Sequence, residues 1–582
     1  MLYFPVKKKI IPRPAQHTNS QALAHLPRLL QRVYAARHVT QAEEVDHSLS
    51  RLPAPAALQG METLVRHLET SIRQNHKILV IADYDADGAT ACAVALLGLQ
   101  AMGARRVEYL VPSRFGFGYG LTPELVAVAQ ALEPDVLLTV DNGISSLEGV
   151  AAARALGMKV LITDHHLPGP LLPDADAIVN PNLPGDTFPG RVLAGVGVMF
   201  YVLMALRSSL RQSGWFASSG MQEPNLGQWL DLVALGTVAD VVKLDHVNRI
   251  LVHQGLQRIR TGKARPGIMA LIDVAGRKHT QSTTTELGFT IAPRLNAAGR
   301  LEDMSLGIRC LLATDPDQAR DLALELDRLN RERREIEAQM QDDALQHLER
   351  LDLGGVDRSG LCLYDPAWHQ GVIGILASRI KDRFHRPVIA FAPGVTGELK
   401  GSARSIDGIH IRDVLSDMAT AHPGLIKKFG GHAMAAGLSL EQDNYPRFTA
   451  VFDAFVAERL AGLDLERSVL TDGELESAEM VLEMAEALEA SGPWGQGFPE
   501  PLFQGEFDVL NCRILKDRHL KFLFKLPDRD TGVDGIAFSV DNPAAWLNCA
   551  RLRLVYRLEV NEFRENRSLQ LRVEYMEADE AA

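Results

Sequence analysis

The stretch KILVIADYDADG, residues 77–88, decides the fold of the first part of the chain. Its first six residues are apolar apart from the leading lysine, which is typical of a short strand buried on both faces. Its last six residues place Asp83, Asp85, Asp87 and a glycine directly behind that strand. The small-residue run that follows, residues 88–99, predicts a helix. An α/β unit therefore opens here, with acidic side chains at the end of its first strand.

The same strand signature returns along the next hundred residues. Four further short apolar runs lie at residues 107–111, 136–140, 159–163 and 177–179, and helical segments such as 147–156 lie between some of them. Short all-apolar strands that alternate with helices are typical of a parallel sheet covered on both faces. We therefore predict a parallel-sheet α/β domain.

Polar residues follow two more of these strands at the point where each strand ends. Asp141 directly follows the third strand, and Asp164, His165 and His166 follow the fourth. A later apolar run ends at Asp240. Because the carboxyl ends of strands in open parallel sheets line the ligand crevice, we expect these side chains to gather with the three aspartates of the first strand.

Carboxylates gathered in this way would repel one another strongly without bound cations. Two unit charges about 4 Å apart interact by roughly 4 kcal/mol at an effective dielectric constant of about 20. Aspartate and histidine ligands without thiolate suit Mn²⁺ or Mg²⁺ better than structural zinc, so the pattern predicts two divalent metal ions that share a carboxylate. A lone aspartate after a strand is more often a turn former or a helix cap; recurrence after the same strand signature favours the metal centre.

The rest of the chain predicts two further folded units. Asp315 and Pro316 form a favourable helix start, and leucines at helical spacing continue to about residue 350, which predicts one long connecting helix. A second strand–helix alternation begins near residue 361. Alternating apolar residues at 551–560 predict antiparallel strands, and hence a small barrel or sandwich, in the last part of the chain.

Composition limits the classes of function. Hydrophobic residues make up 46% and charged residues 23% of the 582 residues, as in ordinary globular proteins. The net charge of −12 excludes a globally basic nucleic-acid binder, although a local basic groove stays open. The 5 cysteines form no CxxC pair and fit a reduced, cytoplasmic setting. We expect no membrane association, because no apolar run approaches the roughly 20 residues that span a bilayer and no signal peptide is evident.

Four motifs, taken in order, resemble those of the DHH phosphoesterase superfamily. They are DYDADG at residues 83–88, VDNG at 140–143, DHH at 164–166 and Asp240. Over about residues 70–440 the chain further resembles the RecJ branch of that superfamily, which consists of exonucleases that act on single-stranded DNA. The motifs that carry this resemblance are residues 111–114, 118–121, 293–301, 368–374, 401–405 and 430–432.

This resemblance implies an α/β fold in which a parallel-sheet DHH domain is joined by a long helix to a second α/β DHH-associated domain, followed by a C-terminal OB-like β-barrel. The implied segments are an N-terminal helical segment, the catalytic domain, the connecting helix, the DHH-associated domain and the barrel, at residues 1–70, 71–310, 311–350, 351–465 and 466–582. The cofactors would be two divalent metal ions, Mn²⁺ or Mg²⁺.

The resemblance also assigns roles to individual residues. The implied metal ligands are Asp83, Asp85, Asp87, Asp141, His165 and Asp240, with Asp141 as the bridge. Asp164, His165 and His166 are the implied catalytic group, and His166 is a candidate to protonate the leaving 3′-oxygen. Many superfamily members carry a histidine where this chain has Ile81, which leaves the ligand set of the second metal open.

A track for the nucleic acid is implied as well. Its expected members are Arg114, Tyr119, Arg294, Asn296, Arg300, Gln370, Ser402, Arg404, Gly430, Gly431 and His432. Arginine binds phosphate bidentately and glycine permits close backbone approach, although an arginine among small residues is often an ordinary surface residue.

In the barrel, basic residues such as Lys521 and Lys525 alternate with Phe522 and Phe524. The alternation fits either a single-strand-binding face or a core covered by solvated charges, and it places Tyr556 in the core.

Three functions follow from these patterns. The first is a monomeric 5′-to-3′ exonuclease that releases 5′-mononucleotides from single-stranded DNA in recombination and repair, with a single-strand-binding protein and a helicase as partners. The second is a pyrophosphatase, a cyclic-dinucleotide phosphodiesterase or a short-oligonucleotide ribonuclease of the same superfamily, against which the chain length and the barrel argue. The third is a non-enzymatic scaffold, against which the intact aspartate motifs argue.

Overall fold

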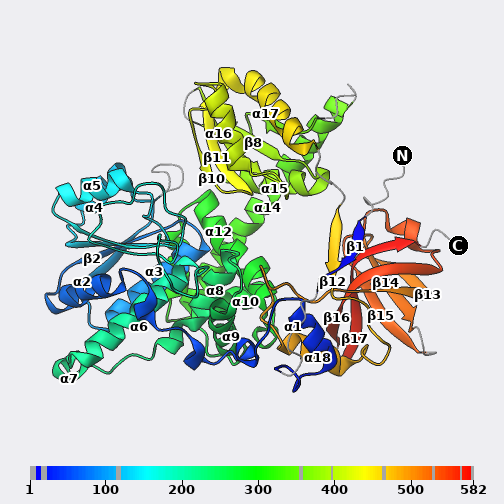
Figure 1. The fold of residues 1–582 in the computed structure, drawn as a ribbon, viewed down its shortest axis with the longest axis horizontal. Coiled ribbons are helices and arrows are strands. Elements are labelled where there is room, and N and C mark those ends of the chain that lie inside the picture. Colours follow the sequence, from blue (N-terminus) through cyan, green and yellow to red (C-terminus); the bar gives the residue numbers. More distant parts are fainter. Residues whose placement is uncertain are drawn as a thin grey trace. The chain divides into compact units, whose positions relative to one another are not determined.

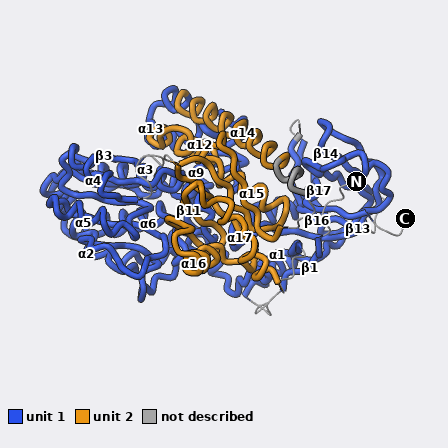
Figure 2. Tube along the Cα trace, turned by 90° about the horizontal axis from the view of Figure 1, so that it is seen from above, with its two compact units in different colours: residues 1–292, 308–320, 466–582 blue, residues 293–307, 321–465 orange. Residues whose placement is uncertain are grey.

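The computed structural model describes most of the chain. The described residues are 8–14, 22–112, 120–352, 358–394, 397–461, 467–526, 531–563 and 566–578. The chain folds into two compact units, coloured separately in Figure 2. Unit 1 consists of residues 1–292, 308–320 and 466–582, and unit 2 consists of residues 293–307 and 321–465.

The first part of unit 1 is built on a five-stranded parallel sheet in the order β3-β2-β4-β5-β6. The strands are β2 (Ile78–Ala82), β3 (Val107–Leu110), β4 (Val136–Val140), β5 (Lys159–Thr163) and β6 (Ala177–Val179). Every residue of β2 and β4 is buried, which explains why these strands are apolar apart from Thr139. The strand order reverses direction between β2 and β4, and this switch point is where open sheets of this kind bind ligands.

Helices cover both faces of this sheet, as the sequence predicts (Figure 1). On one face α4 (Pro123–Gln130) and α5 (Leu147–Ala155) pack on the side chains of Leu79, Ile81 and Leu137. The other face carries α2 (Met61–Arg73), α3 (Ala86–Ala101) and α6 (Gly195–Gln212). Behind α3 lie α8 (Leu230–Ala239) and, against α8, α9 (His246–Arg260). Helix α3 is buried along most of its length, and its alanines and glycines allow this close packing.

The last part of unit 1 is a closed five-stranded barrel, which confirms the predicted C-terminal barrel. Its strands are β13 (Phe503–Leu515), β14 (His519–Lys525), β15 (Gly532–Ala537), β16 (Arg551–Phe563) and β17 (Asn566–Ala578). Phe522, Phe524 and Tyr556 are at most 1% exposed and form its core. A single-strand-binding face built on Phe522 and Phe524 is therefore wrong, because both rings point inward.

The N-terminal segment contains a strand that the sequence pattern does not predict. β1 (Lys9–Pro12) pairs in parallel with β12 (Ser468–Thr471), just ahead of the barrel. Arg37, which follows α1 (Arg28–Ala35), donates to the buried Asp472 with Nη1 and Oδ1 2.7 Å apart. The segment is therefore attached to the barrel region and is not helical throughout.

Unit 2 contains a second five-stranded sheet in the order β10-β11-β9-β8-β7. Its strands are β7 (Leu361–Tyr364), β8 (Val388–Pro393), β9 (Glu398–Arg404), β10 (Lys428–Gly431) and β11 (Ala435–Glu441). Only the β7–β8 pair is parallel among the described pairings of this sheet. The helices α15 (Ile373–Phe384), α16 (Ile411–Ala421) and α17 (Tyr445–Leu460) complete the α/β fold.

The long helix predicted between the two α/β parts is α14 (Pro316–Asp352), and it begins at the predicted proline. Several of its charges form ion pairs along the helix, such as Arg328 with Glu325 and Arg333 with Glu337. Among the described residues, no helix is both long enough and apolar enough to cross a bilayer.

Candidate metal centre

The loops that follow β2, β4 and β5 bring the predicted acidic and imidazole side chains together. Three combinations of these side chains have their ligand atoms within 4.8 Å of one another. They are Asp83 with Asp85 and Asp141, Asp87 with His165 and Asp240, and Asp141 with His165 and His166. Asp240 comes from the C-cap of α8 and not from a strand. The implied ligands therefore form one cluster at the switch point of the sheet.

His165 lies at the centre of this cluster. Its Nε2 atom is 3.1 Å from Asp141 Oδ1, 3.4 Å from Asp240 Oδ2 and 4.0 Å from Asp87 Oδ2. This nitrogen is buried and makes no hydrogen bond to any residue that the structure describes. A buried imidazole nitrogen that faces three carboxylates is suited to bind a cation between them.

Asp85 both caps a helix and faces the cluster. Its Oδ1 atom accepts hydrogen bonds from the backbone N–H groups of Asp87 and Gly88, each at 3.0 Å, and so caps α3. A Cβ atom on Gly88 would lie 2.5 Å from the backbone oxygen of Asp83, which explains the glycine. The helix-cap interpretation is thus correct for Asp85, and the cap fixes the turn that carries all three aspartates.

Asp87 is held by the N-terminus of α6. The backbone N–H groups of Gly195 and Val196 donate to its two carboxylate oxygens at 2.6 and 3.0 Å. A Cβ atom on Gly195 would lie 2.5 Å from Asp141 Oδ1, and one on Gly236 would lie 2.8 Å from Asp87 Oδ1. These two glycines make room for the carboxylates, yet nothing in their local sequence marks them; only their place in the fold does.

Asp141 occupies an unusual backbone conformation. Its φ of 63° lies in the left-handed region, which aspartate tolerates better than most residues. The side chain of the next residue, Asn142, donates to the backbone oxygens of Ile81 and Val140 at 3.0 and 2.9 Å and so fixes this turn. The Ile81 side chain packs in the apolar cluster under α4 and α5. It therefore contributes nothing to the metal centre.

Asp164 positions the two histidines. Its Oδ1 atom accepts from the backbone N–H of His165 at 2.7 Å and lies 2.8 Å from His166 Nδ1, while Oδ2 accepts from the backbone of Ile144 at 2.9 Å. Burial alone would raise the pKa of Asp164, but the hydrogen bond from His166 and the charges of both imidazoles lower it. Burial alone would likewise lower the pKa of His166, but the hydrogen bond and charge of Asp164 raise it to about 9.

The carboxylates of the cluster are destabilised as anions. Burial raises the pKa of Asp87 to about 7, and the nearby Asp85 adds to the rise. Burial first, and repulsion by neighbouring carboxylates second, raise the pKa values of Asp141 and Asp240 well above the ordinary value. Burial and the adjacent imidazole lower the pKa of His165 to about 4. Divalent cations would relieve the repulsion among these anions, so the donor set fits them.

A second group of predicted residues meets in unit 2. Ser402 and Arg404 lie on β9, with Arg404 Nη1 3.1 Å from Ser402 Oγ. A Cβ atom on Gly374, in the first turn of α15, would lie 3.0 Å from both of these side chains. Backbone N–H groups at a helix N-terminus beside an arginine and a hydroxyl form an anion-binding arrangement.

Gly430 and Gly431 belong to β10 of the same sheet, and His432 directly follows this strand. Gly430 pairs with Gly437, which in turn pairs with Ser402, so a row of small residues crosses β10, β11 and β9. Gln370 is exposed in the turn that precedes α15. The structure therefore gathers the predicted phosphate-binding residues at 402–404 and 430–432 on one sheet.

The remaining members of the predicted track differ in their surroundings. Arg294 is 8% exposed and forms an ion pair with Asp327, with Nη2 and Oδ1 2.8 Å apart. Arg300 donates to the backbone oxygen of Gly371 at 3.0 Å, and Asn296 is half-buried on α12 (Ala292–Leu301). Arg114 and Tyr119 lie outside the described residues.

Family models match three parts of the chain. The DHH family N-terminal domain matches residues 77–237, the DHHA1 domain matches residues 357–458, and the RecJ OB domain matches residues 471–575. These matches fall on the parallel-sheet part of unit 1, on the second α/β part and on the barrel.

Curated relatives are similar over nearly the whole chain. The chain is 53% identical over 554 residues to the single-stranded-DNA-specific exonuclease RecJ of Dickeya dadantii, which covers 95% of this chain and 96% of that protein. It is 52% identical over 551 residues to the exonuclease of the same name from Escherichia coli, with 94% and 95% covered.

Solved structures agree with these relatives. The crystal structure of RecJ in complex with Mn²⁺ from Thermus thermophilus matches with a TM-score of 0.81 at 30% identity, and covers 98% of this chain and 80% of that one. The complex of RecJ with Mg²⁺ from the same organism matches with a TM-score of 0.74 at 28% identity, with 98% and 78% covered.

Proposed function

The chain belongs to the RecJ family of single-stranded-DNA-specific exonucleases, and from this membership we propose that it hydrolyses single-stranded DNA from the 5′ end and releases 5′-mononucleotides. The observation that carries the proposal is the buried cluster of carboxylates around His165, in which all four aspartate-containing motifs are intact. A scaffold protein that had lost its activity would have no need for this costly arrangement of like charges.

The residues of the cluster divide into ligands and supports. We assign Asp85, Asp87, Asp141, His165 and Asp240 as ligands, with Asp141 as the bridge because it belongs to two of the three ligand combinations. Asp83 shares one combination with Asp85 and Asp141 and completes the set. Bound Mn²⁺ or Mg²⁺ would supply an activated water and would neutralise charge on the scissile phosphodiester.

His166 and Asp164 have a separate role in the proposal. The bond between His166 Nδ1 and Asp164 Oδ1 fixes the orientation of the His166 ring. This geometry leaves Nε2 as the ring atom that can pass a proton to the leaving 3′-oxygen. Asp164 acts as a positioning residue, because its oxygens are engaged by His165, His166 and the backbone of Ile144.

The predicted phosphate-binding residues of unit 2 would hold the phosphate at the 5′ end of the strand. Ser402, Arg404 and the first turn of α15 supply hydroxyl, guanidinium and backbone N–H donors, and Gln370, Gly430, Gly431 and His432 extend this surface. Arg294 and Arg300 support it through Asp327 and Gly371, so we assign them positioning roles. Arg114, Tyr119 and Asn296 remain expected contacts with the strand.

We further propose that the enzyme acts as a monomer in the cytoplasm, in recombination and repair, with a single-strand-binding protein and a helicase. The five segments with boundaries at residues 70, 310, 350 and 465 remain our proposed domain division. The family resemblance supports both proposals.

Substrate preference tests the proposed function directly. We expect the purified protein with Mn²⁺ to degrade a single strand of about 40 nucleotides much faster than the blunt duplex of the same sequence, and faster than a dinucleotide. A higher kcat/KM for the dinucleotide would contradict the proposal and favour a short-oligonucleotide hydrolase of the same superfamily.

A further inference from the structure

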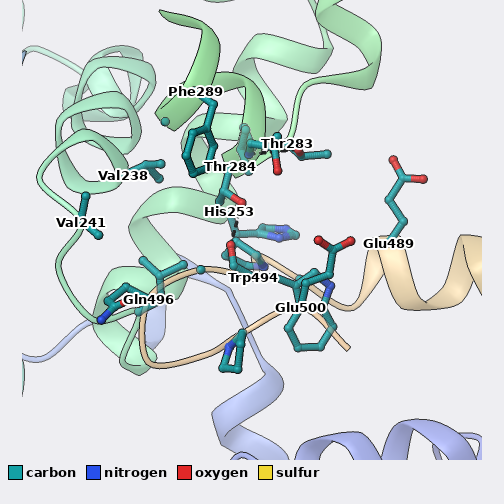
Figure 3. Close-up of a pocket in the computed structure, with 18 of the residues that line it drawn as sticks. Val238, Val241, His253, Thr283, Thr284, Phe289, Glu489, Trp494, Gln496 and Glu500 are labelled. Atoms are coloured by element: carbon teal, nitrogen blue, oxygen red, sulfur yellow. Dashed lines mark hydrogen bonds between the residues drawn. The ribbon is translucent and has the colours of Figure 1, made fainter. Parts of the chain in front are cut away.

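A pocket of about 400 Å³ lies within unit 1, between the end of α8, where Asp240 is the C-cap, and the segment that leads into the barrel. Its apolar wall includes Val238 and Val241, which flank the implied ligand Asp240 in the sequence. Phe289 lines the pocket close to Val238 and next to Thr284, as Figure 3 shows. One residue of the pocket, Val241, therefore directly follows the implied metal ligand Asp240 in the sequence.

Two large apolar side chains are left exposed in this pocket. Phe289 is 77% exposed, the highest value among the large apolar side chains that the structure describes, and Val241 is 63% exposed. Phe289 sits on a π-helix (Leu287–Ile291), a rare conformation that is frequent at functional sites. Val241 has a φ of 59°, which is strained for a β-branched residue. Both residues are held in costly arrangements that fold stability does not explain.

The walls of the pocket are fixed in place. Thr284 Oγ1 donates to the backbone oxygen of Trp494 at 2.6 Å. The backbone N–H of Leu244 donates to the backbone oxygen of Gln496 at 2.8 Å. A Cβ atom on Gly495 would lie 2.7 Å from Leu244 Cδ1, so the two walls are in close contact. The pocket is thus formed before any ligand arrives, which lowers the cost of binding.

The chemistry of the lining selects a flat, neutral, polar ligand. Its charged groups are largely engaged: Arg557 pairs with Glu500, and Arg260 donates to the backbone oxygen of Ser282 at 2.8 Å. The Thr284 side chain lies next to Phe289, and the Gln496 amide lines another part of the pocket, as Figure 3 shows. The lining also holds Glu489, whose charge acts on Arg260, so two carboxylates balance the two guanidinium groups and repel a phosphate. A nucleobase has both a π-face for stacking and an edge for hydrogen bonds.

We propose that this pocket binds one unpaired base of the substrate strand, stacked on Phe289, within a few nucleotides of the bond that is cut. The inference rests on the proposed function, because that function brings a single strand to Asp240. A base that is paired in a duplex cannot enter the pocket. Phe289 is therefore a residue that determines the specificity for single strands.

A scan with abasic substrates tests the pocket. Single strands of one sequence carry one abasic site at each of the first six positions from the 5′ end, and KM is measured with Mn²⁺ for the wild type, Phe289→Ala and Phe289→Tyr. Stacking of a base on an aromatic ring is worth about 1–3 kcal/mol, or roughly 5- to 150-fold. We expect one abasic position to raise the KM of the wild type and of Phe289→Tyr by an amount in this range. In Phe289→Ala the KM for the intact strand rises similarly and the abasic penalty disappears.

The control is Leu156→Ala, which shortens another exposed apolar side chain, 46% exposed, at the end of α5. Its KM values should match those of the wild type, and melting temperatures verify that all variants are folded. Two results would contradict base binding in this pocket without contradicting the proposed function. One is an equal rise in KM at the abasic position in the wild type and in Phe289→Ala. The other is an unchanged KM of Phe289→Ala for the intact strand. No nucleotide release from the intact strand by the wild type would overturn both.

Discussion

At the scale of single residues, Asp141 combines the features on which the metal centre depends. It is buried, it belongs to two of the three ligand combinations, and its carboxylate lies 3.1 Å from His165 Nε2. Its left-handed backbone conformation places it against Gly195, where no larger residue fits. A change at this position alters the charge of the cluster without the need for a large rearrangement of the fold.

We expect Asp141→Asn to lower kcat by more than 100-fold with Mn²⁺, because even groups that only orient metal ligands contribute about 10- to 100-fold. The same variant should melt at a higher temperature than the wild type in the metal-free state, since one of several repelling carboxylates is removed. Asp174→Asn is the matched control, because Asp174 is an exposed aspartate of the same domain. A metal-free melting temperature that falls would contradict the proposed repulsion.

Arg404 gives a prediction for the phosphate site. Lysine retains the charge but not the planar fork of arginine, so Arg404→Lys should raise KM for 5′-phosphorylated strands about tenfold or more while kcat changes little. Arg412→Lys on the exposed side of α16 serves as the control. The comparison uses strands with and without a 5′-phosphate. An equal KM increase for both kinds of strand would show that Arg404 does not bind the terminal phosphate.

The sequence indicates which residue types form the metal centre but not what holds them in place. Asp83 to Asp87, Asp141 and His165 were predictable, because each follows an all-apolar strand and parallel strands end at one edge. Gly195 and Gly236 were not, because their role depends on a Cβ atom that would meet a carboxylate from a distant segment. The ion pair of Arg294 with Asp327 was not predictable either, because Asp327 lies on another helix.

At the scale of helices and strands, an element can be predicted when neighbouring residues alone carry its pattern. The strands of the first sheet are buried on both faces and therefore consist of recognisable apolar runs. β1 has only four residues and pairs with a strand more than 450 residues later, so no local pattern indicates it. In the barrel, alternation predicts the strands and places Tyr556 in the core, which is confirmed, but it leaves open whether Phe522 and Phe524 face the core or a bound strand.

Segment 41–52 packs on α9 through His47 and His253, whose ring centroids are 4.8 Å apart. Burial first, and the neighbouring His253 second, lower the pKa of His47 to about 3, and burial lowers the pKa of His253. The neutral forms therefore stabilise this contact above the unfolded pKa of about 6.5, and the contribution is lost as the pH falls from there toward the folded values.

Hydrogen exchange should reveal this loss. After correction for intrinsic rates, we expect residues 41–52 to be less protected at pH 5 than at pH 7.5, and His47→Phe to abolish the difference because phenylalanine packs without titrating. Equal protection of the wild type at both pH values would contradict the assignment. The exchange of the first parallel sheet provides an internal reference.

At the scale of the whole molecule, the barrel contributes less positive charge to DNA binding than its sequence suggests. Lys521 pairs with Asp534 at 2.9 Å, and Arg572 lies 3.3 Å from Glu574. The turn between β13 and β14 instead carries Lys516 and Arg518, both exposed. If the barrel binds the strand, we expect phosphate contacts at these two exposed residues.

We expect the double variant Lys516→Gln/Arg518→Gln to bind a single strand more weakly and with a shallower salt dependence. Each lost phosphate contact should reduce the slope of log K against log salt by about 0.7. Binding is measured by fluorescence anisotropy at several salt concentrations, with Ca²⁺ in place of Mn²⁺ to limit cleavage. Arg154→Gln, in a surface ion pair with Asp174, is the charge control. An unchanged slope would exclude this turn from the strand's path.

In the proposed function, metal ions held by the Asp141–His165 cluster drive hydrolysis of a single strand from its 5′ end. The most direct test incubates a long single strand, labelled at the 5′ end or at the 3′ end, with the purified protein and Mn²⁺, before and after addition of a chelator. We expect the 5′ label to appear at once as a mononucleotide, the 3′ label to remain on progressively shorter strands, and both changes to stop with the chelator. Digestion that continues without metal, or immediate release of the 3′ label as a mononucleotide, would contradict the account.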